Sequence, residues 1–239
     1  MNKDDLLGED WNKLIGSELD KPYMKELAVK LGWLRKNRPN TVVPARSDQV
    51  FRAFKETRLN EVRVVIIGQS PYPSLTHANG LAFSTDSKYI TASLEKILYS
   101  IDRDVMFGAD VFKYCYLDAI NDNNYTLSHW IDEGILLLNA NLTAEVNNPR
   151  AHEGRGWERF ISFILSSLLD YTEGISYLAW GKQAKAVCDP ILLSTRNNLY
   201  ISCEHPASAV YGNRNWNNKK CFKRVNEYQE QMGQYIISW

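Results

Sequence analysis

The chain alternates between short apolar runs and longer segments in which apolar residues recur every three or four positions. The short runs span residues 62–67, 134–138, 175–180 and 199–203. They lack the strict alternation of a half-exposed strand, which is typical of strands covered on both faces. Helical spacing occurs in residues 93–101 and 157–169, and more weakly in residues 182–192 and 218–232. The pattern predicts buried strands that alternate with helices.

Strands that alternate with helices form a mostly parallel sheet, because each crossover returns the chain to the same end of the sheet. The sequence contains no internal repeat and no linker rich in Pro, Gly or Ser. We therefore predict a single domain over residues 1–239, a three-layer α/β/α sandwich with a central four-stranded, mostly parallel sheet. Ligands of such folds bind beyond the carboxyl ends of the strands, so candidate chemistry is expected directly after each apolar run.

Composition and charge narrow the class of protein. A hydrophobic content of 44% with 23% charged residues is ordinary for a globular domain. The formal net charge is zero, so any nucleic-acid site must be a local patch. The four cysteines form no CxxC pair and no metal-ligand cluster is visible, so we expect no metal, no cofactor and a cytoplasmic location. Without a signal peptide or a membrane-spanning run, we expect no membrane partner.

Polar and aromatic residues follow each predicted strand. The four strand ends carry, in chain order, Gln69, Ser70, Tyr72 and Phe83, then Asn139, then Gly181 and Lys182, and finally His205. Taken alone, Asn139 would simply cap a helix. The turn at Gly181 is a strand-to-helix connection whose amides also suit a phosphate. A purely structural loop explains poorly why Gln69, Tyr72 and Phe83 gather around a stiff turn with two prolines.

Taken together, these segments resemble the uracil-DNA glycosylase family. The family's GQDPYP, GLAFS, LLLN, WG and HPSPLS motifs have counterparts, in that order, at residues 68–73, 80–84, 136–139, 180–181 and 205–210. Residues 152–160 look like its HxGxGWExF segment. The resemblance covers nearly the whole chain. It implies a monomeric enzyme that binds DNA, flips a nucleotide out of the stack and breaks the bond between sugar and base, without metal or cofactor.

The resemblance also implies a role for each motif residue. Phe83 would stack on the flipped base, Asn139 would read its edge, and Tyr72 would lie against C5 and exclude thymine. His205 would donate to O2 of the base as negative charge develops there, and Gln69 would help to hold the base. We also expect contacts to DNA from Ser93, His152, Gly181, Lys182, Ala209, Tyr211 and Arg214, although Lys182 and Ala209 depart from the family pattern and Arg214 belongs to a separate basic cluster. An amide suits uracil in one orientation and cytosine in the other, so Asn139 alone does not determine which base is bound.

One departure from the family pattern concerns the chemistry. Ser70 stands where the family has an aspartate that orients water and stabilises the cationic sugar, and a hydroxyl supplies no negative charge. A unit charge at about 4 Å contributes about 4 kcal/mol at an effective dielectric of about 20, so its loss is expected to slow the step roughly a thousandfold. Glu204 is an alternative acid, but strand alternation is expected to turn it away from the side occupied by His205.

A second departure concerns the contact with DNA. Ala209 stands where the family has a leucine that fills the vacated stack, which leaves Val210 or Tyr211 as alternative wedges. Beyond this loop, basic residues gather around Trp216 within residues 214–224. This cluster is either a solvated helix face or a contact to the DNA backbone, and we favour the DNA contact.

Three functions stay open at this point. The first is a uracil-DNA glycosylase whose activity is altered by Ser70. The second is a glycosylase for a hypermodified viral pyrimidine, acting in defence against phage, which Tyr72 opposes. Small residues would widen its site: Ser70, Ala140, Ala207 and Ala209. The third is a module that binds DNA or protein and no longer catalyses, although such a module has no physical need for the aromatic, amide and imidazole groups.

Overall fold

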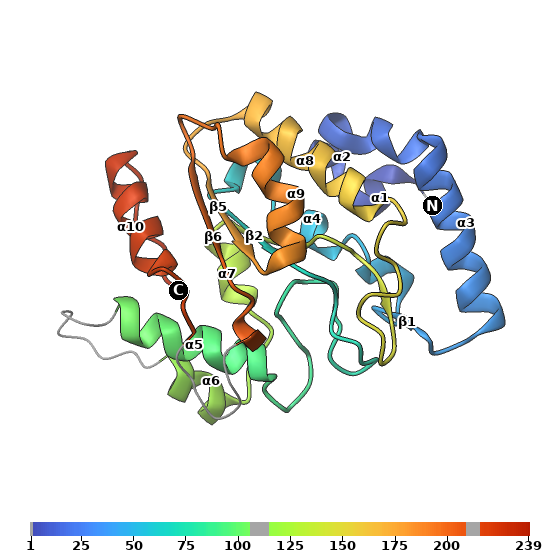
Figure 1. The fold of residues 1–239 in the computed structure, drawn as a ribbon, viewed down its shortest axis with the longest axis horizontal. Helices are drawn as coiled ribbons and strands as arrows, with labels where there is room; N and C mark the ends of the chain where they lie inside the picture. Colours follow the sequence, from blue (N-terminus) through green and yellow to red (C-terminus); the bar gives the residue numbers. More distant parts are fainter. Residues whose placement is uncertain (1, 106–114, 209–215) are drawn as a thin grey trace.

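The computed structural model describes residues 2–105, 115–208 and 216–239 of the chain (Figure 1). Its central sheet has four strands in the order β3-β2-β5-β6, and every pairing is parallel. The strands are β2 (Val64–Gly68), β3 (Ile135–Asn139), β5 (Ser176–Trp180) and β6 (Leu199–Cys203). All residues of β2, β3 and β5 are buried, which explains their continuous apolar runs. The predicted sheet is confirmed.

Helices cover both faces of this sheet. On one face α8 (Trp157–Tyr171) packs against α9 (Lys182–Leu192), and α2 (Glu9–Ile15) lies beside α8. On the other face lie α5 (Ala92–Val105), α7 (Ser128–Asp132) and α10 (Cys221–Gln231), with the sheet between α9 and α10 (Figure 1). The predicted three-layer α/β/α sandwich is therefore confirmed. Further helices are α1 (Lys3–Leu7), α3 (Pro22–Asn37), α4 (Arg52–Glu56) and α6 (Cys115–Asp122).

A small antiparallel sheet outside the main one is absent from the sequence prediction. It pairs β1 (Val42–Val43) with β4 (Ala144–Glu145). Strands of two residues are too short to produce a readable period in the sequence. Their pairing ties the segment after α3 to the chain that leaves β3, next to the carboxyl ends of the main strands.

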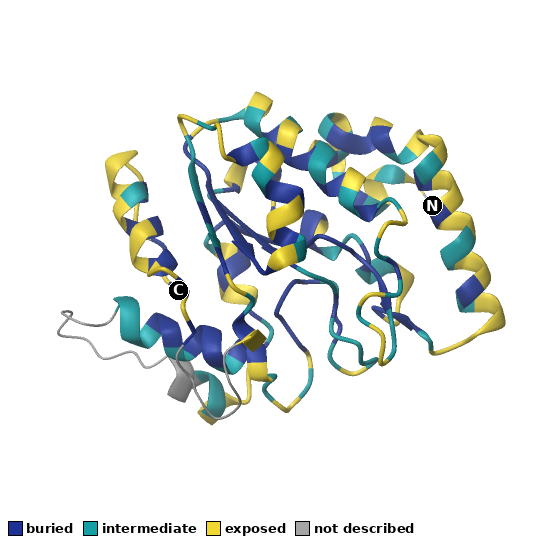
Figure 2. Cartoon of the chain, in the orientation of Figure 1, coloured by how far each residue is buried: buried dark blue, intermediate teal, exposed yellow. Residues whose placement is uncertain are grey.

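The core is continuous on both sides of the sheet, as the dark blue strands and inward helix faces of Figure 2 show. Helix α8 buries Phe160, Ile161, Ile164 and Leu168, the three- and four-residue spacing of an amphipathic helix. On the opposite face, edge-to-face aromatic contacts join Trp130, Trp180, Trp216, Phe222 and Trp239. In the described part of the chain, no helix combines the length and apolar character needed to span a bilayer.

Candidate active site

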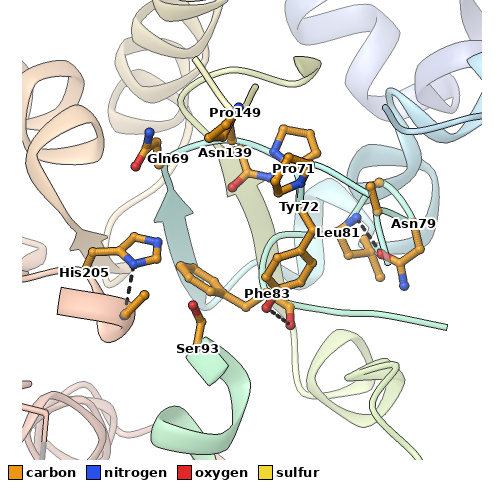
Figure 3. Close-up of a pocket in the computed structure, with 15 residues that line it drawn as sticks. Gln69, Pro71, Tyr72, Asn79, Leu81, Phe83, Ser93, Asn139, Pro149 and His205 are labelled. Atoms are coloured by element: carbon orange, nitrogen blue, oxygen red, sulfur yellow. Dashed lines mark hydrogen bonds between the residues drawn. The ribbon is translucent and has the colours of Figure 1, made fainter. Parts of the chain in front are cut away.

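A cavity of about 240 Å³ opens at the carboxyl ends of the central strands (Figure 3). Among its lining residues are seven that the sequence singled out: Gln69, Ser70, Tyr72, Phe83, Ser93, Asn139 and His205. These residues come from four separate segments of the chain, which the parallel sheet brings to one edge. Ala207, one of the small residues expected to widen the site, also lines the cavity, as does Pro149, to which no role was assigned.

Gly68, the last residue of β2, allows two of these side chains to approach the strand end. A β-carbon at Gly68 would lie 2.6 Å from Oδ1 of Asn139 and 2.9 Å from Cε2 of Phe83, closer than a side chain permits. Backbone hydrogen bonds from Ala140 to the carbonyl of Gly68 (2.9 Å) and from Asn141 to that of Gln69 (3.0 Å) join the two loops. The amide of Asn139 and the ring of Phe83 therefore meet at one fixed point.

Phe83 forms an aromatic wall in an unusual backbone conformation. Its φ of 64° lies in the left-handed region, which a bulky residue rarely adopts and which often marks functional sites. The ring packs 5.1 Å from that of Trp180 and 5.7 Å from that of His205, measured between centroids. The backbone carbonyl accepts a hydrogen bond from the Tyr72 hydroxyl at 3.0 Å. The aromatic platform is therefore held from both its ring and its backbone.

The Tyr72 hydroxyl has two partners. Because the carbonyl of Phe83 only accepts, Tyr72 donates to it and receives the hydroxyl hydrogen of Thr91, whose Oγ1 lies 2.6 Å away. Thr91 in turn accepts from the amide of Leu94 and so caps the first turn of α5. Burial raises the pKa of Tyr72, which keeps its phenol protonated. The tyrosine ring is thus tied to the platform and to the start of α5.

His205 presents a neutral imidazole to the cavity. The backbone N–H of Ala207 donates to its Nδ1 at 3.1 Å, drawn as the dashed line at His205 in Figure 3. Nδ1 must then be unprotonated, so the ring hydrogen of the neutral form sits on Nε2. Burial, and to a smaller extent the positive charge of Lys96, lowers the pKa of His205 to about 4. At neutral pH the ring is an uncharged hydrogen-bond donor.

Two other segments hold His205 in place. A β-carbon at Gly181 would lie 3.1 Å from Cβ of His205, so the glycine makes room for the histidine. The indole of Trp216 donates to the carbonyl of Glu204 at 2.9 Å and fixes the residue before it. Trp216 itself is buried against Trp180, so it belongs to the core and not to an exposed basic cluster.

A larger hollow of about 640 Å³ adjoins the cavity and shares His205 with it. Its lining includes the lysines Lys182, Lys185 and Lys219 with one carboxylate, that of Glu204. Glu204 is exposed and lines this hollow, and it does not line the cavity with Ser70. An excess of positive charge beside the cavity suits a phosphate backbone.

Two expected DNA contacts are corrected by the structure. His152 is 1% exposed, and its Nδ1 lies 2.8 Å from Oγ1 of Thr143, which also accepts from the indole of Trp157. A side chain enclosed in this way braces the turn before α8 and cannot reach DNA. The amide of Gly181 donates to the carbonyl of Cys203 at 2.9 Å, so it is not available to a phosphate. Ala209, Tyr211 and Arg214 lie outside the described residues, as does Val210.

The lining of the cavity carries no formal charge. None of its fifteen described residues is Asp, Glu, Lys or Arg. Ser70 offers only a hydroxyl. Nor do the described residues contain a group of three or more His, Cys, Asp or Glu side chains placed to hold a metal ion. The site therefore offers an aromatic platform, an amide, a hydroxyl and a neutral imidazole donor.

Sequence comparisons show which proteins share this arrangement. The family described as the uracil DNA glycosylase superfamily matches residues 54–229. The uracil-DNA glycosylase of Lachnoclostridium phytofermentans is 32% identical over 236 residues, covering 98% of this chain and 97% of that protein. The uracil-DNA glycosylase of Shouchella clausii is 32% identical over 234 residues, covering 98% and 94%.

A solved structure shows the same fold. The crystal structure of mimivirus uracil-DNA glycosylase superposes with a TM-score of 0.81 at 23% identity, covering 100% of this chain and 89% of that one. The family match and the two relatives extend through every segment that lines the cavity. The chain thus belongs to the uracil DNA glycosylase superfamily and is a monofunctional DNA glycosylase.

Proposed function

We propose that this protein excises uracil from DNA and leaves an abasic site. The observation that carries this proposal is the tether of Tyr72. Its hydroxyl is held by the carbonyl of Phe83 at 3.0 Å and by Thr91 at 2.6 Å. Moving the ring aside for a bulky C5 group would break both hydrogen bonds and disturb the platform on which the base stacks. Uracil has only hydrogen at C5 and requires no such movement.

The other lining residues fit a flipped uracil. Phe83 would stack on the base, because its ring is fixed between Trp180 and His205. The amide of Asn139 would pair with O4 and N3–H of uracil, and the Gln69 segment would complete the edge. Nε2–H of His205 would donate to O2. The fold positions these groups before the base binds, so binding requires little further ordering of the protein.

The bond between C1′ and N1 breaks with its electron pair leaving on the base. Negative charge then spreads to O2, where a positioned neutral donor such as His205 stabilises it. A water molecule adds to C1′ and gives up a proton to solvent, and the uracil anion takes up a proton from solvent, which yields free uracil and the abasic sugar. Ser70 would orient that water through its hydroxyl but supplies no charge to the sugar, so we expect a slower enzyme than one with a carboxylate here.

The DNA backbone would pass along the hollow that adjoins the cavity. Lys182 is exposed at the start of α9, and Lys185 and Lys219 line the same hollow. Ser93, at the first turn of α5, would contact a phosphate on the other side of the cavity. Such contacts are independent of sequence and strongly dependent on salt.

Excision is tested with oligonucleotides that carry one uracil, thymine, cytosine or 5-hydroxymethyluracil, followed by alkaline cleavage at abasic sites. We expect breaks at uracil alone. Tyr72→Ala should extend cleavage to thymine, whereas Tyr72→Phe, which keeps the ring and loses the tether, should do so weakly. Breaks at 5-hydroxymethyluracil and none at uracil would refute the proposal and favour a modified-pyrimidine substrate.

A further inference from the structure

Breaking a glycosidic bond separates two opposite charges, and the charges around the site decide which of them is stabilised more. The sugar becomes cationic and the departing base anionic. The cavity lining provides no carboxylate for the sugar, since none of its described residues is Asp or Glu and Ser70 offers only a hydroxyl. A buried charge that acts on the site is therefore important for the reaction.

Lys96 is such a charge. It is 8% exposed and lies in α5, one helical turn after Ser93, which lines the cavity. Residues three apart lie on the same side of a helix, so Lys96 and Ser93 lie on one face. Helix α5 also packs against the turn Pro206–Ser208, which follows His205. Lys96 is thus a buried residue of the helix that borders both the cavity and the turn after His205.

The field of Lys96 reaches the group that would contact the base. Its positive charge is the second cause, after burial, of the lowered pKa of His205. A charge that disfavours a positive imidazole favours negative charge on a base hydrogen-bonded to that imidazole, and the effect is large where water is excluded. The amino-terminal end of α5, at Ser93 in Figure 3, adds a dipole of the same sign.

We propose that Lys96 is a positioning residue that stabilises the departing base anion through His205, so that charge near this site assists the leaving group and not the sugar. The inference rests on the proposed excision of uracil and deepens it. No additional reactant is involved: the electron pair of the C1′–N1 bond goes to the base, and water supplies the new bond at C1′. Lys96 gains and loses no proton.

The test compares uracil with 5-fluorouracil in single-turnover excision. Fluorine withdraws electrons and stabilises the base anion by itself, so 5-fluorouracil needs less help from the protein, and the small substituent fits beside Tyr72. We expect Lys96→Met to slow uracil excision about tenfold or more and 5-fluorouracil excision distinctly less. Lys96→Arg should keep most of the rate on both bases, because it keeps the charge.

Two further variants make the result decisive. Lys13→Met removes a lysine from α2, where it pairs with Glu9 away from the cavity, and should leave both rates unchanged. Lys96→Gln is a second neutral replacement, and the melting temperature of each variant shows that it is folded.

Equal slowing of both bases by the folded neutral variants, a rise in KM alone, or no slowing would each overturn this inference. The first result would mean a structural role, and the second a contact to DNA phosphate. Wild-type protein that excises neither base would instead overturn the proposed function, and this inference with it. The two failures are therefore distinguishable by the behaviour of the wild type.

Discussion

Gly181 and His205 pack so closely that a β-carbon added to Gly181 would press against the histidine side chain. A β-carbon on Gly181 would lie 3.1 Å from Cβ and 3.3 Å from Cδ2 of His205. The glycine has φ of 104°, a conformation that L-residues rarely adopt. The turn after β5 therefore packs against the imidazole after β6, and both the backbone conformation and the close contact favour glycine there.

Gly181→Ala should displace the imidazole and slow excision. A misplacement of about 1 Å at a catalytic group costs up to roughly a hundredfold in rate, so we expect a loss of about ten- to a hundredfold. Single-turnover rates on uracil DNA measure it. Gly8→Ala is the matched control, because Gly8 also has positive φ, at 82°, but nothing lies within 4 Å of its added β-carbon. Similar rates for both variants would contradict a steric role for Gly181.

Ser70→Asp should raise the rate of uracil excision. A carboxylate there would stabilise the cationic sugar, and a charge contributing about 4 kcal/mol corresponds to a gain of up to roughly a thousandfold. The measurement is the single-turnover rate at saturating enzyme. Ser70→Asn is the control, since it has nearly the same size as aspartate and no charge. If both variants gain equally, or neither gains, charge at this position does not limit the reaction.

Activity should stay constant as pH falls through 6.5, the ordinary pKa of histidine. The lowered pKa of His205, about 4, keeps its imidazole neutral and bonded to the amide of Ala207 across that range. Below about pH 4 the ring gains a second hydrogen, loses that acceptor at Nδ1, and kcat/KM should fall. NMR titration of the ring reports the pKa directly. A decline in kcat/KM centred near 6.5 that is absent in His205→Gln would contradict this assignment.

The same lowered pKa predicts how stability changes with pH. The unfolded histidine binds its proton near pH 6.5, whereas the folded one does so near pH 4. The contribution of His205 to the free energy of unfolding is therefore fully present above pH 6.5 and is lost as pH falls from 6.5 towards 4. Denaturant unfolding of wild type and His205→Gln across this range shows the difference.

Substitutions at His152 and Lys182 should affect different properties, the first stability and the second DNA binding. His152→Ala removes one of the two hydrogen-bond partners of the buried Thr143 hydroxyl and should cost about 1–3 kcal/mol in the free energy of unfolding. Lys182→Ala should leave stability unchanged and reduce the salt slope of binding by about one. Binding is measured with DNA that carries uncleavable 2′-fluorodeoxyuridine. If folded His152→Ala also shows a reduced salt slope, His152 contacts DNA, contrary to its buried position in the structure.

The sequence predicted the sheet and the gathering of seven cavity residues because both follow from local pattern and parallel topology. Four apolar runs fix four strands, and parallel strands carry whatever follows them to one edge. Asn139 and His205 are 66 positions apart in the chain, yet both line the cavity. That relationship required no knowledge of side-chain contacts.

The features that the sequence could not reveal are those that depend on burial or on contacts between residues far apart in the chain. Lys96 lies among the helical positions of residues 93–101, and nothing in the pattern separates a buried lysine from a solvated one. The hydrogen bond of Thr91 to Tyr72 joins residues nineteen positions apart. His152 matches a motif but is enclosed by Thr143, and Trp216 sits in a basic stretch but packs in the core.

The most direct test of the account is to identify the base released from uracil-containing DNA by mass spectrometry, for wild type, Asn139→Ala and His205→Ala. Wild-type protein should release free uracil in a one-to-one ratio with abasic sites, and both folded variants should release it at least roughly a hundredfold more slowly. Release of another base, or wild-type rates in both variants, would contradict the claim that this cavity holds and expels a flipped uracil.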